Sequence, residues 1–398
     1  MAEAEPGRPS QARTPPAVAL PVVAREWTRI GLTGFGGPPA HIALLRRLVV
    51  ERRRWLAADD LEAAIAACNL LPGPASTQLA IYLAGRLGGP AGAVLGGLGF
   101  ILPAVLCVVA LSAVFFGQSP PDWIRGAGAG AGAAVAAVAI QAGLTLLRPS
   151  LERARRRARQ LPRWAGYVAL GAAAAALIGP YLVLVLVGCG LAELGWRRLG
   201  AGAVDRLGSW SALPLAAASV GGIGSLGWVA LKVGALSYGG GFVIIPLMQG
   251  DAVHTYHWMS STQFLNAVAL GQVTPGPVVA TVAAVGYAAH GVGGALLAAA
   301  IAFTPSFAFV LIGGRRFDRL RADPRAQSFL DGAGPAALGA ILGSAIPLTG
   351  ALQETWQYAV LAAAALALLL ARRGVVLVLV AAGVAGAVAA IAGAPLPH

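Results

Sequence analysis

Long apolar stretches recur along the chain, separated by short polar segments that contain most of the arginines. Each stretch is about as long as the roughly 20 residues that a helix needs to cross the hydrocarbon core of a bilayer. The apolar stretches lie near residues 91–116, 126–147, 228–248, 264–289, 291–313 and 374–393. Several stretches of this length, rather than a single one, predict an all-α polytopic membrane protein.

The composition leads to the same class. Hydrophobic residues make up 57% of the 398 residues and charged residues only 11%, whereas a soluble domain needs about a quarter charged residues to cover its surface. Most of the surface therefore has to face lipid. Residues 1–24 are rich in Pro and Arg and lack the apolar core of a cleavable signal peptide, so we expect a disordered N-terminal tail.

The cysteines and the net charge limit the function further. The three cysteines lie far apart in apolar segments, without the spacing of metal ligands or of a redox pair, so we expect no metal and no cofactor. The formal net charge of +13 is compatible with nucleic-acid binding, but the arginines lie beside apolar stretches rather than among stacking aromatic residues. Cytoplasmic loops of membrane proteins collect Lys and Arg. The charge thus favours a lipid bilayer as the partner and no nucleic acid.

An internal repeat divides the chain. Residues 31–80 align without a gap with residues 234–283, at an offset of 203 residues. The repeat predicts two homologous modules, residues 25–195 and 226–393, joined by a linker at 196–225. The identical positions include glycines, a tryptophan and a Pro-Gly-Pro motif: Gly31, Gly36, Gly37, Trp55, Pro72, Gly73 and Pro74, matched by Gly234, Gly239, Gly240, Trp258, Pro275, Gly276 and Pro277.

The arginines indicate how the two modules are oriented. Residues 46–54 contain five arginines and the matching residues 249–257 none, whereas 112–125 contains one and the matching 315–328 five. Since such a bias marks the cytoplasmic side, its reversal predicts an inverted-topology repeat. With every arginine-rich loop in the cytoplasm, residues 56–90 have to enter and leave the membrane on the same side. This predicts a broken or re-entrant helix pair at each Pro-Gly-Pro motif.

The two Pro-Gly-Pro motifs are the clearest candidates for a binding site. Proline removes a backbone donor and glycine permits unusual dihedral angles, so a helix cannot run through them undisturbed. A helix that restarts at membrane depth offers free N–H groups and the positive end of its dipole to an anion. A pair of purely structural kinks is the competing interpretation. Polar residues beside the breaks add hydrogen-bonding groups: Asn69, Ser76, Thr77 and Gln78 in the first copy, and Gln272, Thr274 and Thr281 in the second.

Each module also places one cation ahead of a glycine cluster. Arg29 precedes the cluster at 35–37. Lys232, the only lysine, precedes the cluster at 238–241 and is separated from Arg29 by the repeat offset of 203 residues. An unpaired ammonium at mid-bilayer costs at least about 2.5 kcal/mol, so we expect both cations to compensate the charge of a bound anion. Snorkelling to the interface is the simpler interpretation. The cluster glycines either approach the ligand or pack helices closely: Gly36, Gly37, Gly239 and Gly240.

His41 breaks the symmetry between the two copies, because Ile244 stands at the matching position. A histidine changes its charge near neutral pH, which makes His41 a candidate for proton coupling. A polar packing role fits it equally well. No constellation of Asp, Glu, His or Cys lies within the apolar segments, and we therefore predict that the protein is not an enzyme.

Taken together, these motifs resemble the chromate ion transporter family in its two-domain form, over nearly the whole chain from about 25 to 393. The resemblance implies a bacterial or archaeal inner-membrane protein that expels chromate, with sulfate as a related or competing oxyanion. The second copy departs from the first where Thr281 replaces Gln78. The segments that carry the resemblance are 35–41, Trp55, 71–78 and 102–103, with second copies at 237–241 and 272–277.

The residues thus predict an alternating-access secondary transporter for an anion, and the resemblance implies that it exports chromate across the inner (plasma) membrane and confers chromate resistance. The anion is expected near the midplane, where the two breaks converge. A transporter of sulfate or another inorganic anion, and an anion channel, are competing hypotheses, since tetrahedral dianions of similar size need the same residue types. The coupling ion, the number of spans and the oligomeric state, a homodimer included, are left open.

Overall fold

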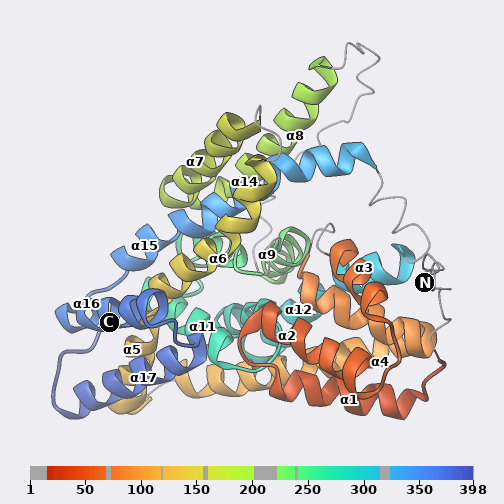
Figure 1. Ribbon diagram of the computed structural model, residues 1–398. Helices are drawn as coiled ribbons and strands as arrows, with labels where there is room; N and C mark the ends of the chain where they lie inside the picture. Colours follow the sequence, from red (N-terminus) through yellow and green to blue (C-terminus); the bar gives the residue numbers. More distant parts are fainter. Residues whose placement is uncertain are drawn as a thin grey trace, which may run out of the picture.

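The computed structural model describes residues 16–68, 73–117, 120–155, 160–200, 222–237, 241–313 and 323–397. Every regular element in this part of the chain is a helix (Figure 1). Four candidate residues lie outside the described residues: Asn69, Pro72, Gly239 and Gly240. The first half contains α1 (Leu20–Thr33), α2 (Gly37–Arg46), η1 (Arg47–Arg52), α3 (Ala58–Cys68), α4 (Ala75–Phe115), α5 (Asp122–Ala133), α6 (Val135–Arg155), α7 (Leu161–Leu177), η3 (Gly179–Tyr181) and α8 (Leu182–Gly200).

The second half follows the same order of helices. The π-helices η1 and η4 lie at matching positions, and each ends next to a residue with a φ of 52°, Arg54 or His257. This agreement in local geometry supports two modules of one design. The second half contains α9 (Ile223–Leu236), α10 (Ile244–Gln249), η4 (Gly250–Thr255), α11 (Ser261–Val273), η5 (Val278–Thr281), α12 (Val282–Gly313), α14 (Pro324–Gly343), α15 (Ala345–Gly350), α16 (Thr355–Ala365), η6 (Leu366–Leu370) and α17 (Val375–Ile391).

The ordered helices reach slightly beyond the module boundaries expected from the repeat. Helix α1 begins at Leu20, within the segment expected to be a tail. It does so because Val23 is fully buried and because the N–H of Val18 donates to the carbonyl oxygen of Leu87 at 2.9 Å. Helix α8 extends to Gly200, within the segment expected to be a linker.

The long helices α4 and α12 each contain a sharp turn. Gly89 in α4 has φ 66° and ψ −165°, which is not helical, and Gly291 in α12 has φ 61° and ψ −152°. The chain folds back at these glycines. This is seen in α4, where a β-carbon on Gly97 would lie 2.9 Å from the side chain of Ile81. These residues would be far apart on a straight helix with a rise of about 1.5 Å per residue. The segment that follows each Pro-Gly-Pro motif is therefore a helical hairpin.

Four helical segments among the described residues are long and apolar enough to cross a membrane. Large apolar side chains on α4 are exposed, such as Leu102 and Leu106, which are 45% and 58% accessible. Side chains of this kind are stable on a surface that contacts lipid. The chain is therefore a multi-pass membrane protein. The four segments are Ala75–Phe115, Asp122–Arg155, Val278–Gly313 and Pro324–Gly350.

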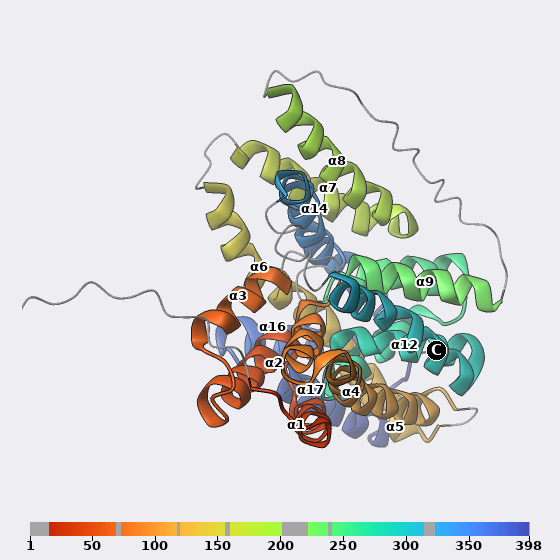
Figure 2. The same ribbon diagram turned by 90° about the vertical axis from the view of Figure 1, so that its right-hand side faces the viewer.

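The two modules exchange helices. Helix α5 packs against α17, and α14 packs against α7 and α8, so each pairing joins one module to the other. Figure 1 and Figure 2 both show α7, α8 and α14 together, at the top of the view. Glycines permit the contact, because a β-carbon on Gly171 of α7 would collide with the carbonyl oxygen of Ala336 in α14. Neither module can therefore be removed without uncovering a helix face of the other.

Candidate functional site

The two Pro-Gly-Pro motifs break their helices in the same way. Gly73 has a φ of 114° and Gly276 a φ of 101°, a region that residues with a β-carbon rarely adopt. Each break lies against the first helix of the other module. A β-carbon on Gly73 would lie 3.4 Å from the carbonyl oxygen of Gly234, and one on Gly276 would lie 3.6 Å from that of Gly31. The contacts are reciprocal, as a two-fold relation between the modules requires.

A backbone hydrogen bond also joins the two modules at the second break. The N–H of Gly276 donates to the carbonyl oxygen of Gly34, at the end of α1, at 2.9 Å. The ring of His41 lies at the same junction: its Nε2 is 3.0 Å from Gly34 O and its Nδ1 is 3.2 Å from the Ser76 hydroxyl. A carbonyl oxygen only accepts, so Nε2 carries the hydrogen and Ser76 donates to Nδ1. His41 thus connects the start of α4 with the second break.

Helix α4 begins directly after the first break. Pro74 is its N-cap and provides no side-chain acceptor, while the N–H groups of Thr77 and Gln78 both donate to the Pro74 carbonyl at 3.0 Å. The earlier N–H groups of such a helix have no acceptor within it. The Thr77 side chain is fully buried, and its hydroxyl has no partner among the described residues. A buried donor without a partner at the positive end of a helix is suited to an anion.

The second break offers fewer available donors than the sequence predicts. The Thr274 hydroxyl donates to Gly271 O at 3.3 Å and the Thr281 hydroxyl to Val278 O at 2.7 Å. Each hydroxyl has one hydrogen, so neither can donate to a ligand in this conformation. Gln272 differs, since its side-chain nitrogen is buried and without a partner in the described part of the chain. Gln272 is therefore the stronger candidate on this side.

The two glycine clusters meet at the start of η5. A β-carbon on Gly37 would lie 3.8 Å from the side chain of Val278, and one on Gly241 would lie 3.6 Å from it. Gly36 and Gly37 both have positive φ, 99° and 73°, so their conformation as well as their packing favours glycine. One described glycine from each cluster, Gly37 and Gly241, therefore lies against the first residue after the second break.

Ser237 is a polar residue of this site that the sequence interpretation missed. Its hydroxyl is fully buried, lacks a partner among the described residues, and lies 3.8 Å from a β-carbon position on Gly241. The available signal was the repeat: Ser237 matches Gly34, and it directly precedes the second glycine cluster. A hydroxyl at that position adds a third buried donor to Thr77 and Gln272.

Lys232 is not the unpaired cation that the sequence predicts. Its ammonium group forms an ion pair with Asp251 of η4, and the two side chains are 5% and 7% exposed. The polar sequence around Asp251 suggests a loop. Residues 250–255 instead form a π-helix, in which the Asp251 carboxylate is buried. Asp251 is therefore a buried acidic residue and not part of a solvent-exposed loop. The net charge of the pair is zero unless another anion replaces Asp251.

Arg29 lies on the surface, as the competing interpretation of snorkelling expects, and not at the breaks. It is exposed and lines a surface pocket together with Arg25, Arg52 and Arg53. Neither Arg29 nor Lys232 is among the residues that line a cavity of about 1110 Å³ next to the first break. The structure thus does not bring the two cations together at the breaks.

That cavity, of about 1110 Å³, connects the first break with an arginine-containing end of the protein. Gly36, Gly73 and Ala75 line its inner end, whereas the exposed Arg153 lies on its wall at the end of α6. One face of α6 forms part of the wall, because its lining residues recur every fourth position: Gln141, Thr145, Pro149 and Arg153. The cavity therefore extends from the exposed Arg153 to the start of α4.

Apolar spanning helices, two helix breaks and a cavity that reaches one of them define the class of polytopic α-helical membrane transporters. The family model for chromate transporters matches residues 22–194 and 224–387, and the chain belongs to this family. The family consists of transporters, which confirms the prediction that the protein is not an enzyme. The match to both halves also agrees with two modules.

Curated relatives extend over most of the chain. The chromate transport protein of Cupriavidus metallidurans is 33% identical over 348 residues, with 84% of each chain covered. The chromate transport protein of Pseudomonas aeruginosa is 32% identical over 418 residues, covering 97% of this chain and 98% of the relative. A probable chromate transport protein of Synechococcus elongatus is 30% identical over 347 residues, covering 84% and 85%. No solved structure matches the chain.

Proposed function

We propose that the protein is a secondary active transporter that exports chromate across the bacterial inner membrane and thereby confers chromate resistance. Membership of the chromate transporter family supports the substrate class. One structural observation carries the choice of site: beside the two breaks, Thr77, Ser237 and Gln272 hold buried polar groups that have no partner among the described residues. Unsatisfied buried donors cost free energy, which a bound oxyanion would recover.

In the proposed site the dianion binds at the start of α4, at the inner end of the large cavity. The helix terminus contributes positive potential, and Thr77 donates directly. In the neutral form of His41, the Ser76 hydroxyl donates its hydrogen to Nδ1. When Nδ1 is protonated it donates to the Ser76 oxygen instead, and the hydroxyl hydrogen of Ser76 becomes available to the anion. His41 would then link proton uptake to anion binding. Lys232 would contribute charge if the anion replaced Asp251 as its partner.

The proposal includes an inverted relation between the modules. The reciprocal contacts of Gly73 and Gly276 support a two-fold axis, and the reversed arginine bias between the modules favours an axis in the membrane plane. With the arginine-rich loops in the cytoplasm, α3 and the first arm of the α4 hairpin form a re-entrant pair. Alternating access would then expose the same pair of breaks to either side in turn.

The transport assay uses inverted membrane vesicles that contain the protein. Radiolabelled chromate should accumulate above the level of empty vesicles when a proton or potential gradient is imposed. No excess at any imposed gradient would refute chromate export. Competition by unlabelled sulfate in the same assay separates a chromate-selective site from one that accepts tetrahedral dianions in general.

An anion channel is the second candidate, because the cavity is wide and the inverted repeat suits either mechanism. A channel passes ions far faster than a transporter and only down their gradient. Steady single-channel conductance in a planar bilayer that contains chromate would favour the channel, whereas accumulation driven by a pH gradient with the membrane potential held at zero would exclude it.

A further inference from the structure

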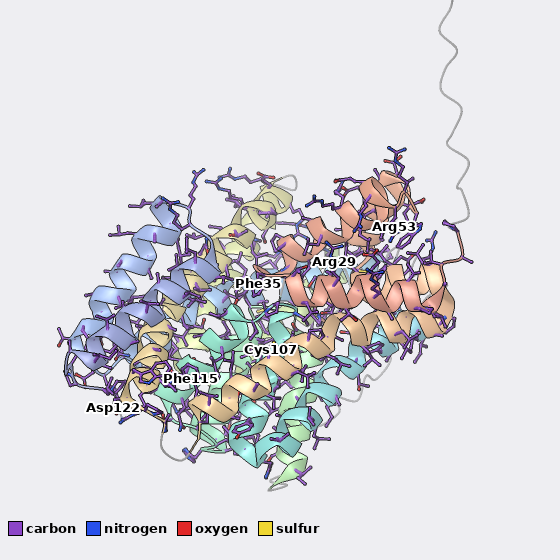
Figure 3. All side chains as sticks on the ribbon, turned by 90° about the horizontal axis from the view of Figure 1, so that it is seen from below. Arg29, Phe35, Arg53, Cys107, Phe115 and Asp122 are labelled. Carbon is purple, nitrogen blue, oxygen red and sulfur yellow. The ribbon has the colours of Figure 1, made fainter. Side chains whose placement is uncertain are left out.

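A second pocket, of about 740 Å³, lies on the outer side of α1 and shares no lining residue with the large cavity. Its charged lining residues come from α1 and from the end of η1: Arg25, Glu26, Arg29, Arg52 and Arg53. Figure 3 shows Arg29 on α1, Phe35 just beyond the C-terminal end of α1, and Arg53 on the same side of the molecule. The pocket is thus a feature of the surface, separate from the breaks.

The pocket carries an excess of positive charge. Glu26 is its carboxylate, with a side chain 8% exposed, and it pairs with Arg53 at 2.6 Å and with Arg52 at 3.9 Å. Arg25 and Arg29 are exposed, and neither forms an ion pair within the described residues. One carboxylate therefore faces four guanidinium groups. Two of the four have their planar hydrogen-bonding forks available for a ligand.

The exposed face of α1 changes from cationic to apolar along the helix. Arg25, Arg29 and Leu32 are spaced four and three residues apart, so they lie on one face. Leu32 is 52% exposed and also lines the pocket, and Phe35, two residues beyond the end of α1 at Thr33, is 46% exposed. A phospholipid has the same sequence of groups, with an anionic phosphate next to acyl chains. A free oxyanion would have no use for the apolar end.

We propose that this pocket binds the phosphate of an anionic phospholipid, with its acyl chains along Leu32 and Phe35. Arg25 and Arg29 donate to the phosphate oxygens, since guanidinium groups bind phosphate with two parallel hydrogen bonds. Glu26 holds Arg52 and Arg53 at the rim. The bound lipid connects α1 with the end of η1, two elements that belong to the same module.

The test is native mass spectrometry of the full chain in detergent, with phosphatidylglycerol or phosphatidylcholine added. The wild-type protein should retain phosphatidylglycerol at least tenfold better than phosphatidylcholine. The double variant Arg25→Gln, Arg29→Gln should lose this preference. The matched control is Arg372→Gln, Arg373→Gln, which removes two exposed arginines elsewhere and should keep it.

Three results would overturn the proposal: equal retention of the two lipids by the wild type, an unchanged preference in the Arg25, Arg29 variant, or displacement of the lipid by millimolar chromate or inorganic phosphate. The last result would assign the pocket to a free oxyanion. The single variant Arg29→Gln keeps the test decisive if the double variant unfolds, and it should lower the preference by at least threefold.

Discussion

Replacing Thr77 by valine should have opposite effects on stability and on transport. Valine has nearly the same shape as threonine, so the packing at this fully buried position is kept and only the hydroxyl is lost. The hydroxyl has no partner among the described residues. The folded protein without substrate therefore loses nothing, whereas the complex with the anion loses a donor.

The two effects can be estimated separately. A buried polar group without a partner costs about 1–3 kcal/mol, so Thr77→Val should raise the free energy of unfolding of the substrate-free protein by about 1 kcal/mol. A hydrogen bond to a charged group contributes about 1.5–3 kcal/mol, and each 1.4 kcal/mol corresponds to about a tenfold change in affinity. The chromate concentration at half-maximal transport should therefore rise about 10- to 100-fold.

Thermal unfolding in detergent and chromate uptake into inverted vesicles measure the two effects. Ser112→Ala is the matched control, because the Ser112 hydroxyl is also buried without a partner but lies near the far end of α4. This control should leave the concentration dependence of uptake unchanged. If Thr77→Val also left it unchanged, the anion would not bind at the start of α4. A loss of stability in Thr77→Val would show that the hydroxyl has a partner.

Three further changes test other parts of the site. Gly276→Ala places a β-carbon 2.7 Å from the side chain of Ala104 at a φ of 101°, so it should abolish transport and lower the melting temperature; wild-type uptake by this variant would show that the break tolerates repacking. Lys232→Met leaves Asp251 buried without its partner and should cost about 3–5 kcal/mol of stability, which Lys232→Met with Asp251→Asn should largely restore. The double variant should still fail to transport, and if it transports, Lys232 does not contribute to the site. His41→Gln should remove the part of the pH dependence of uptake that protonation of His41 causes, and an unchanged pH profile would exclude His41 as the coupling group.

The repeat in the sequence was sufficient to predict the helix breaks, because backbone constraints are local. Proline and glycine determine which dihedral angles a segment can adopt, whatever surrounds it. Gly73 and Gly276 accordingly have nearly the same φ, 114° and 101°. The membrane class and the family follow from equally direct signals, namely apolar length and motif identity, and both predictions are confirmed.

Side-chain partners could not be predicted in the same way. Whether Thr274 and Thr281 are available depends on their rotamers, and both hydroxyls bond to carbonyls of their own chain segment. The pairing of Lys232 with Asp251 depends on the π-helix η4, which has no recognisable sequence signature. The exchange of α5 and α14 between the modules depends on contacts between residues far apart in the chain. Periodicity contains no information on such contacts.

The ion pairs of the two modules bear on why the halves are not equivalent. In each module an ion pair connects the first helix to the π-helix region, but the signs are opposite: α1 contributes the acid Glu26, and α9 contributes the cation Lys232. The Arg53 side chain in the first pair is 41% exposed, whereas both members of the second pair are nearly buried. Arg53 can turn into water while Glu26 keeps Arg52 as a partner, whereas separating Lys232 from Asp251 leaves two buried charges unpaired. Only a charged ligand or a proton can therefore separate Lys232 from Asp251, which makes the second module the one in which anion binding can alter the connection between helices.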